Sequence, residues 1–287
     1  MDGRTLVCGV IANPVAHSMS PVLQNLYAQR TGVNLAYVPF KVEPDMLQEM
    51  IQGAYAMNIL GLNVTVPFKS QVMPFLKEID ETAEDIGAVN TLIRIDGGYK
   101  GYNSDVPGIT RVIQEEGYEV DGRDCIVIGA GGAAHAACYA LMKLGARHIY
   151  VLNRTQARSD ELEHWMNSLA GRKIIMSLPL DAWDWIPGDG YLAVQTTSVG
   201  MTPNVGRAAI EDPEFYKKIR CAIDCIYTPT ETKFMQNVKA AGGKAVNGLR
   251  MLLYQGIVSY EIWNPGVKVS EETVLEAECA IMEMLGQ

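Results

Sequence analysis

A lysine that follows a run of alternating apolar and polar residues is the first feature of this chain that can do chemistry. Residues 63–69 read Asn-Val-Thr-Val-Pro-Phe-Lys, and such alternation predicts a half-buried strand. Because proline has no N–H to give to a sheet ladder, Pro67 predicts where the strand stops. Asn63, Thr65 and Lys69 then project near one strand end, where ligand crevices form in open α/β sheets. Lys69 is therefore a candidate for chemistry, and the alternative is an ordinary solvated loop lysine.

Two further polar residues, Asp105 and Asn90, can lie on the same wall as Lys69. Asp105 directly precedes a predicted helix that leads into a second domain, so a carboxylate satisfied by helix N–H groups is the alternative. Asn90 begins another predicted strand. A lysine, an aspartate and an amide that converge on a nicotinamide are enough to move a proton while hydride leaves a secondary alcohol.

Two serines stand at the start of a helix predicted over residues 21–30. The hydroxyl groups of Ser18 and Ser20, with the N–H groups of the first helical turn, can together receive an anion. Helix capping alone explains Ser20 but does not require Ser18. A carboxylate ligand is therefore expected at this helix start.

A glycine-rich turn between a strand and a helix predicts a dinucleotide site. Residues 125–128 are apolar, and Gly129, Gly131 and Ala134 follow with the GxGxxA spacing. The glycines permit a tight turn and a close approach of the backbone to a pyrophosphate, whose charge is favoured at a helix N-terminus. The alternatives are a turn without a ligand and the related loop of a methyltransferase, but the strands on both sides favour the dinucleotide.

The end of the next predicted strand favours NADP over NAD. NAD sites usually offer an acidic residue at this point, whereas this strand ends in Asn153, Arg154 and Thr155, with Arg158 following. A guanidinium group binds phosphate as a bidentate partner, which suits a 2′-phosphate. Alternatively, Thr155 caps the next helix and Arg154 is solvated; for Thr155 the two interpretations are compatible.

Composition limits the classes of function. With 287 residues, 48% hydrophobic and 20% charged, the chain is typical of a soluble globular protein with room for two domains. The net charge of −9 argues against nucleic-acid binding and against attraction to an anionic membrane. Short apolar runs and the lack of a secretory leader predict a cytoplasmic protein. The six scattered cysteines favour reduced, buried thiols, and no Cys/His set completes a metal site.

Alternating elements in the first part of the chain position the lysine and the serines. Strands are predicted at residues 6–11, 36–42, 61–66, 88–95 and 99–102, and helices at residues 21–30 and 44–55. The sequence Asp-Gly-Gly at residues 96–98 predicts a hairpin, which makes the sheet mixed. We expect residues 1–105 to form one α/β domain.

After residue 105, predicted strands and helices alternate along the chain. Helices are predicted at residues 107–116 and 133–144, and strands at residues 125–128, 148–152, 174–177, 191–195, 221–227 and 244–246. Such alternation predicts right-handed βαβ units and a parallel sheet over residues 106–247. The helices expected at residues 249–262 and 271–285 precede no further strand, so residues 248–287 are expected to pack back against the first domain.

Taken together, these segments resemble the shikimate dehydrogenase family over nearly the whole chain. The matching segments are residues 13–21, 63–69, 87–91, 101–105, 129–134, 153–155, 196–201 and 248–263. The resemblance implies an α/β fold, with a substrate-binding domain joined to a doubly wound, Rossmann-type NADP-binding domain. It implies an NADP-dependent oxidoreductase that reversibly reduces 3-dehydroshikimate to shikimate in chorismate and aromatic amino-acid biosynthesis, as a monomer or homodimer.

The resemblance also implies roles for individual residues. Lys69 and Asp105 would form the catalytic pair, and Ser18 and Ser20 would bind the substrate carboxylate. The other implied substrate contacts are Asn63, Thr65, Asn90, Ser104 and Gln255, with Tyr227 closing the cleft. The implied cofactor contacts are Gly129, Ala130, Gly131, Gly132, Ala133, Asn153, Arg154, Thr155, Arg158, Thr196, Ser198 and Gly248.

Two alternative functions remain beside this expectation. One is an NAD-dependent quinate/shikimate dehydrogenase of the same fold, against which Arg154 weighs. The other is a non-catalytic protein that senses shikimate or quinate, against which Lys69, Asp105 and the glycine loop weigh. Departures from the family pattern are mild, such as Gln195 where asparagine is usual and Ser104 where threonine is usual.

Overall fold

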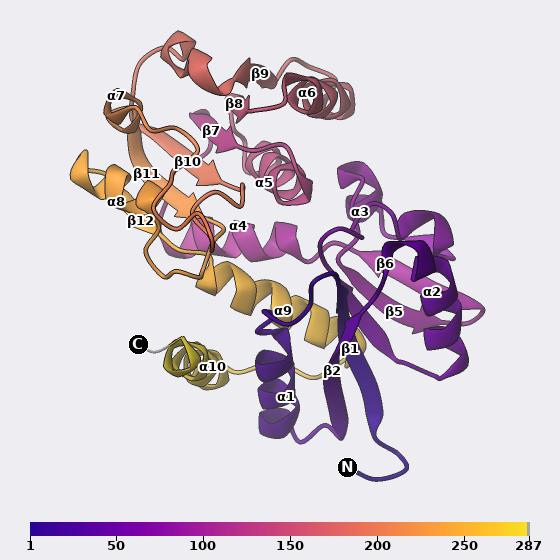
Figure 1. Cartoon of the computed structure of the whole chain (residues 1–287). Helices are drawn as coiled ribbons and strands as arrows, with labels where there is room; N and C mark the ends of the chain where they lie inside the picture. Colours follow the sequence, from indigo (N-terminus) through magenta and orange to yellow (C-terminus); the bar gives the residue numbers. More distant parts are fainter. Residues whose placement is uncertain (286–287) are drawn as a thin grey trace. The chain divides into compact units, whose positions relative to one another are not determined.

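The computed structural model describes residues 1–285 and divides into two compact units (Figure 1). The first unit comprises residues 1–104 and the chain from residue 253 on, and the second comprises residues 105–252. One boundary therefore lies between Ser104 and Asp105, and the other lies inside helix α9 (Leu249–Trp263). Asp105 was expected in the first domain, and residues 248–252 were expected with the C-terminal helices. Both group instead with the second unit.

The first unit is built on a mixed sheet with the strand order β2-β1-β3-β5-β6-β4. Its strands are β1 (Leu6–Ala12), β2 (Leu35–Lys41), β3 (Gly61–Val64), β4 (Glu78–Ile79), β5 (Thr91–Ile95) and β6 (Gly98–Tyr102). β1 runs parallel to β2 and β3, whereas β5 runs antiparallel to β3 and β6. The predicted hairpin is confirmed: Gly97 takes a φ of +77°, which favours glycine, and Gly98 already pairs with Ile95.

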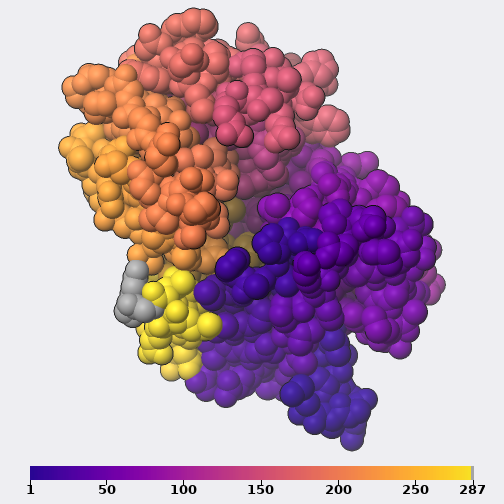
Figure 2. Space-filling model, viewed as in Figure 1, coloured from indigo at the N-terminus to yellow at the C-terminus, as the bar shows by residue number. Residues whose placement is uncertain are grey.

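Helices from both segments of the first unit cover this sheet. They are α1 (Ser20–Thr31), α2 (Leu47–Ala56), α3 (Glu81–Ile86), the C-terminal part of α9 and α10 (Glu271–Met284), with short 3₁₀ turns η1 (Pro44–Met46) and η2 (Met73–Phe75). Arg30 of α1 forms an ion pair with Glu276 of α10. Figure 2 shows the yellow surface of α10 against indigo N-terminal residues. Helix α10 and the part of α9 from residue 253 on thus belong to the first unit.

The second unit has an all-parallel sheet with the strand order β12-β11-β10-β7-β8-β9. Its strands are β7 (Asp124–Ile128), β8 (His148–Asn153), β9 (Ile175–Pro179), β10 (Tyr191–Gln195), β11 (Ile219–Asp224) and β12 (Lys244–Val246). The strand order reverses between β7 and β10, which is the switch point of a doubly wound Rossmann-type sheet. Cysteine and β-branched residues make β7 apolar on both faces, as a central parallel strand requires.

Helices connect these strands in alternation. They are α4 (Asp105–Glu115), α5 (Gly132–Lys143), α6 (Gln156–Ala170), the 3₁₀ segment η3 (Leu180–Trp185), α7 (Pro213–Tyr216) and α8 (Lys233–Ala240). Alanines dominate α5, and Ala134, Ala136 and Ala137 are fully buried, so this helix has both high propensity and a smooth packing face. Helices α3, α7 and α8 have no counterpart among the predicted elements, and α6 was expected only as the helix that follows Thr155.

Three predicted strands are too long. The strand predicted over residues 61–66 ends at Val64, because the Thr65 carbonyl accepts the N–H of Phe68 at 2.8 Å and turns the chain before Pro67. The strand predicted over residues 88–95 begins only at Thr91, since the Ala88 N–H bonds back to the Ala83 carbonyl of α3. The strand predicted over residues 221–227 ends at Asp224.

Candidate functional site

Lys69 lies in a turn that follows β3, and backbone hydrogen bonds fix the conformation of this turn. Phe68 is fully buried and anchors this turn. The Lys69 carbonyl oxygen accepts the N–H of Val89 at 2.8 Å. The side chains of Lys69 and Thr65 are half-buried. The turn therefore holds Lys69 beside the segment that leads into Asn90.

A buried hydrogen-bond network surrounds Asn63, which is 6% exposed. Its Oδ1 atom accepts the Tyr37 hydroxyl at 2.7 Å. Its Nδ2 group donates to Ser259 Oγ at 2.9 Å and, at 3.2 Å each, to Thr91 Oγ1 and the carbonyl oxygen of Asn90. Because the protein holds both ends of the amide, the network sets the orientation of Asn63.

The same network includes Asn90, Ser104 and Gln255. Asn90 Oδ1 accepts the N–H of Ser104 at 2.7 Å, the Ser104 hydroxyl at 3.1 Å and the Thr91 hydroxyl at 3.0 Å. Ser104 Oγ also lies 3.4 Å from Gln255 Oε1, a second acceptor within reach of its proton. The structure thus joins Asn63, Asn90, Ser104 and Gln255, which come from three strand ends and one helix.

The two serines near the start of α1 take different local positions. Ser20 is the first residue of α1, and Met19 takes the N-cap position with no side-chain bond. The Ser18 hydroxyl accepts the N–H of Ser20 at 3.3 Å, so the expectation that Ser20 itself caps the helix is wrong. Burial raises the pKa of Tyr37 well above its usual value, so its phenol stays a neutral donor.

Sequence reasoning missed Tyr37, Thr91 and Ser259, which complete this network. Thr91 follows Asn90 directly, and Ser259 follows Gln255 by one helical turn, so helical spacing places Ser259 on the same face of α9. That spacing was a usable signal. No local pattern connects Tyr37, in β2, with Asn63, because parallel strand pairing through β1 brings them together.

The glycine turn of the second unit has the form of an anion site. Gly131 is the N-cap of α5 and carries no side chain, and the first helical bond runs from the His135 N–H to the Gly131 carbonyl at 3.0 Å. By helix geometry, the N–H groups of residues 131–134 have no intrahelical acceptor and point toward the N-terminal end. A pyrophosphate can receive them there.

The glycine turn also packs against the neighbouring strand end. Gly129 has a φ of +114°, and a Cβ atom there would lie 2.4 Å from Thr196 Oγ1. The Thr196 hydroxyl donates to the carbonyl of Ile128, the last residue of β7, at 2.7 Å. Gly129 and Thr196 therefore form the floor of the switch-point crevice between β7 and β10.

A cavity of about 450 Å³ opens at the carboxyl end of the same sheet. Asn153, Arg154 and Ser198, all predicted cofactor residues, line this cavity. It also has a second guanidinium group, Arg207, which sequence reasoning missed because it lies in an irregular loop. Arg207 Nε bonds Glu211 at 2.8 Å, and this partner holds the pKa of Glu211 below its usual value.

Thr155 and Arg158 do not line this cavity. Thr155 stands at the N-cap position of α6, but its hydroxyl forms no capping bond, so the capping interpretation is right about position and wrong about the bond. Asn153 Nδ2 donates instead to the Thr155 carbonyl at 2.8 Å. Both Arg154 and Arg158 have exposed side chains.

Tyr227 and Gly248 belong to one local cluster of the second unit. The Gly248 N–H donates to the Ile226 carbonyl at 2.9 Å, and a Cβ atom at Gly248 would lie 2.3 Å from the Cys225 carbonyl oxygen. Because Gly248 has no side chain, the segment of residues 225–227, which carries Tyr227, can pack directly against the backbone of Gly248. Burial raises the pKa of Tyr227.

Asp105 is the first residue of α4 and is 6% exposed. The predicted helix start at residue 107 is thus two residues late. Asp105 belongs to the second unit and Lys69 to the first. Their pairing stays a prediction.

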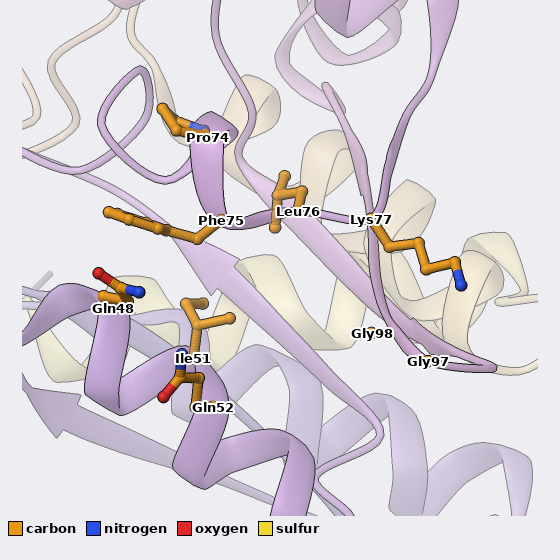
Figure 3. Close-up of a pocket in the computed structure, with 9 residues that line it drawn as sticks. All are labelled: Gln48, Ile51, Gln52, Pro74, Phe75, Leu76, Lys77, Gly97 and Gly98. Atoms are coloured by element: carbon orange, nitrogen blue, oxygen red, sulfur yellow. The ribbon is translucent and has the colours of Figure 1, made fainter.

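A second cavity, of about 370 Å³, lies on the surface of the first unit. Figure 3 shows Phe75 facing Gln48 and Ile51 of α2, and the lining continues through residues 74–77 to the hairpin. None of the predicted site residues lines it. Among residues 1–285, no helix has the length and apolar character to cross a membrane, and no group of three or more His, Cys, Asp or Glu side chains is placed to hold a metal ion.

Two family models match the chain. The model of the shikimate dehydrogenase substrate binding domain matches residues 10–92, and the model named shikimate/quinate 5-dehydrogenase matches residues 111–177. The first match covers the loop with Lys69 and most of the buried network. The second covers the glycine turn and the end of β8.

Relatives and solved structures match over almost the whole length. The NADP(+) shikimate dehydrogenase of Desulforamulus reducens is 38% identical, over 92% of this chain and 91% of the relative. A chorismate mutase/shikimate 5-dehydrogenase fusion protein from Clostridium acetobutylicum has a TM-score of 0.88 and 34% identity, over 99% of both chains. A shikimate dehydrogenase solved in complex with NADP⁺ has a TM-score of 0.88 and 35% identity, over 98% of this chain and 97% of the other. With this identity, coverage and fold, the chain belongs to the shikimate dehydrogenase family.

Proposed function

We propose that this protein is an NADP-dependent shikimate dehydrogenase, which reversibly reduces 3-dehydroshikimate to shikimate. The observation that carries the proposal is the buried network of amides and hydroxyls beside the Lys69 turn, in a chain of this family. Amide and hydroxyl groups with fixed orientations suit a substrate with several hydroxyl groups, because each wrong partner leaves a buried polar group unpaired.

The first unit would bind the substrate. Ser18 and Ser20, near the start of α1, would take the carboxylate, where the positive end of the helix dipole favours an anion. Asn90, Ser104 and Gln255 would contact the ring hydroxyls. The protein itself occupies both ends of the Asn63 amide, so Asn63 would offer mainly the remaining lone pair of Oδ1. Thr65 and Tyr227 stay predicted contacts.

The second unit fits a dinucleotide phosphate. The α5 N-terminus with Gly129, Ala130, Gly131, Gly132 and Ala133 would hold the pyrophosphate. Arg154 and Asn153, on the 450 Å³ cavity, would hold the adenosine end, and a guanidinium there suits a 2′-phosphate. Three further residues would line the rest of the cofactor site: Thr196, Ser198 and Gly248. Thr155 and Arg158, which do not line the 450 Å³ cavity, stay predicted cofactor contacts. Bound NADPH would supply the hydride.

Lys69 would carry the proton transfer with Asp105. Lys69 would donate a proton to the C3 oxygen of 3-dehydroshikimate as hydride reaches that carbon. In the oxidative direction the same amine would receive the proton from the hydroxyl.

One assay tests the activity and its rivals. Absorbance at the nicotinamide band is followed with shikimate or quinate, each crossed against NADP⁺ or NAD⁺. We expect shikimate with NADP⁺ to give the highest kcat/KM. Reduction with quinate and NAD⁺ would support the second candidate, a quinate/shikimate dehydrogenase, both of whose substrates appear in the name of the second family model. No reduction in any combination would contradict both and favour a sensing protein.

The role of Lys69 has its own test. Lys69→Ala is expected to lower kcat about a hundredfold or more, because general acid–base catalysis contributes on this scale, with a smaller change in KM. Lys77→Ala is the matched control, because Lys77 is exposed and lines the separate surface cavity of the same unit. Unchanged turnover in Lys69→Ala would eliminate the proposed role.

The location and assembly of the protein belong to the same proposal. We expect a cytoplasmic enzyme that acts on small molecules as a monomer or homodimer and binds neither nucleic acid nor membrane. Light scattering coupled to size-exclusion chromatography measures the oligomeric state, and cell fractionation measures the location.

A further inference from the structure

Ser259 is a fully buried hydroxyl group on α9 to which the proposed function assigns no role. It lies one helical turn after Gln255, and its hydroxyl donates to the Gln255 backbone carbonyl at 3.0 Å. A serine can satisfy its hydroxyl in this way anywhere in a helix. The oxygen of Ser259, however, has three further neighbours that are not in its helix.

These neighbours are all polar groups of the buried network. The oxygen of Ser259 lies 2.9 Å from Asn63 Nδ2, 2.8 Å from Thr91 Oγ1 and 3.1 Å from Ser104 Oγ. Two of the three, Asn63 and Ser104, belong to the proposed substrate contacts. Ser259 therefore links helix α9 to the ends of three strands of the sheet.

The single proton of Ser259 decides the direction of these bonds. Ser259 donates this proton to the Gln255 carbonyl, and the lone pairs of Ser259 Oγ then accept the Asn63 N–H. An acceptor at this point requires the N–H end of the Asn63 amide and rejects its oxygen end. With Tyr37 donating to Oδ1 on the opposite side, only one of the two amide orientations satisfies both partners.

We infer that Ser259 is a positioning residue for the substrate, which acts through Asn63 by fixing the orientation of its amide. This inference rests on the proposed function, in which Asn63 contacts the substrate. Without Ser259, the Asn63 N–H loses its shortest acceptor.

The test is Ser259→Ala, measured in the full-length protein. We expect the KM for shikimate to rise about tenfold with kcat changed less than threefold, because Lys69 is outside the contacts of Ser259. The KM for NADP⁺ is expected to stay within twofold of the wild-type value. Calorimetric titration with shikimate alone gives the same comparison as a dissociation constant, without turnover.

Two further variants separate positioning from stability and from volume. Ser270→Ala is the matched control, because Ser270 is another C-terminal serine of the first unit, whose hydroxyl accepts the N–H of Thr273 at the start of α10. It is expected to lower the melting temperature and leave the KM for shikimate unchanged. Ser259→Cys nearly preserves the volume but is a poor hydrogen-bond partner, so it is expected to raise this KM as alanine does.

The outcomes distinguish the inference from the proposed function. A wild-type KM for shikimate in both Ser259 variants, with only a lower melting temperature, would overturn the inference and leave the function standing. A wild-type KM in Ser259→Cys alone would also overturn it, since volume would then explain the alanine result. A wild-type protein that neither binds nor oxidises shikimate would contradict the function, and the inference with it.

Discussion

At the scale of single residues, Asp224 shows how a buried carboxyl group organises a loop of the second unit. It is fully buried at the end of β11. It accepts the Thr232 hydroxyl at 2.5 Å, the N–H of Ile226 at 2.9 Å and Gln195 Nε2 at 3.3 Å. These bonds end the strand earlier than the sequence predicts and hold the segment that carries Tyr227.

Burial raises the pKa of Asp224 to about 6, against an unfolded value of about 3.9. Between these values the folded state holds an extra proton, so the stability that this group contributes is full below about pH 4 and falls as pH rises through about 6. Asp224→Asn does not ionise. We therefore expect its stability relative to the wild type to improve by about 1 kcal/mol between pH 5 and pH 8.

Denaturant unfolding of both proteins at the two pH values measures this difference. Asp189→Asn, a change at an exposed loop residue of the same unit, serves as the control. A difference between Asp224→Asn and the wild type that does not change with pH would contradict the raised pKa.

At the scale of elements, the first unit depends on how closely helix α9 approaches strand β3. Trp263 is 3% exposed and donates from Nε1 to the Leu92 carbonyl at 2.8 Å. Its indole occupies the space beside Gly61, where a Cβ atom would lie 2.1 Å from Nε1. Only glycine permits this packing, which also brings Ser259 and Gln255 to the network.

Gly61→Ala is expected to destabilise the protein by about 3 kcal/mol, because the new methyl group overpacks the core and displaces the buried indole from its hydrogen bond. Gly53→Ala is the control: Gly53 lies inside α2, where a Cβ atom would meet nothing within 4 Å. That change should stabilise the helix by about 0.5–1 kcal/mol. Equal stability of both variants in chemical denaturation would show that Trp263 does not pack as described.

At the scale of the whole molecule, the two units differ in how the chain builds them. The second unit is one continuous segment, and a hydrophobic cluster within it contains buried residues from Ile126 to Val238. The first unit is assembled from two segments, because Ser259, Tyr260 and Trp263 come from beyond residue 252.

Dissection of the chain should reveal this difference. Residues 105–252 alone are expected to fold cooperatively, whereas residues 1–104 alone should stay largely unfolded, since the sheet then lacks the buried surface of α9. Residues 1–104 joined by a flexible linker to residues 253–287 are the matched control and should regain structure. Circular dichroism with thermal melting measures all three. Cooperative folding of residues 1–104 alone would refute the expectation.

Much of this fold could be predicted because its signals are local. A few consecutive residues are enough to predict each apolar strand, the glycine-rich dinucleotide turn and the Asp-Gly-Gly hairpin. The strand ends were less predictable, because bonds from Phe68 to Thr65 and from Ile226 to Asp224 end them, and these bonds form only in the folded chain.

The sequence by itself determined the family, the two α/β regions and the residue types of the site. Only the tertiary structure decided which of these residues meet. Parallel pairing of β1 with β2 and β3 brings Tyr37 to Asn63, and the packing of α9 brings Ser259 to Thr91 and Ser104. The reason is physical: a hydrogen bond acts over about 3 Å, and burial strengthens it, so its partners are chosen by the final packing and not by spacing along the chain.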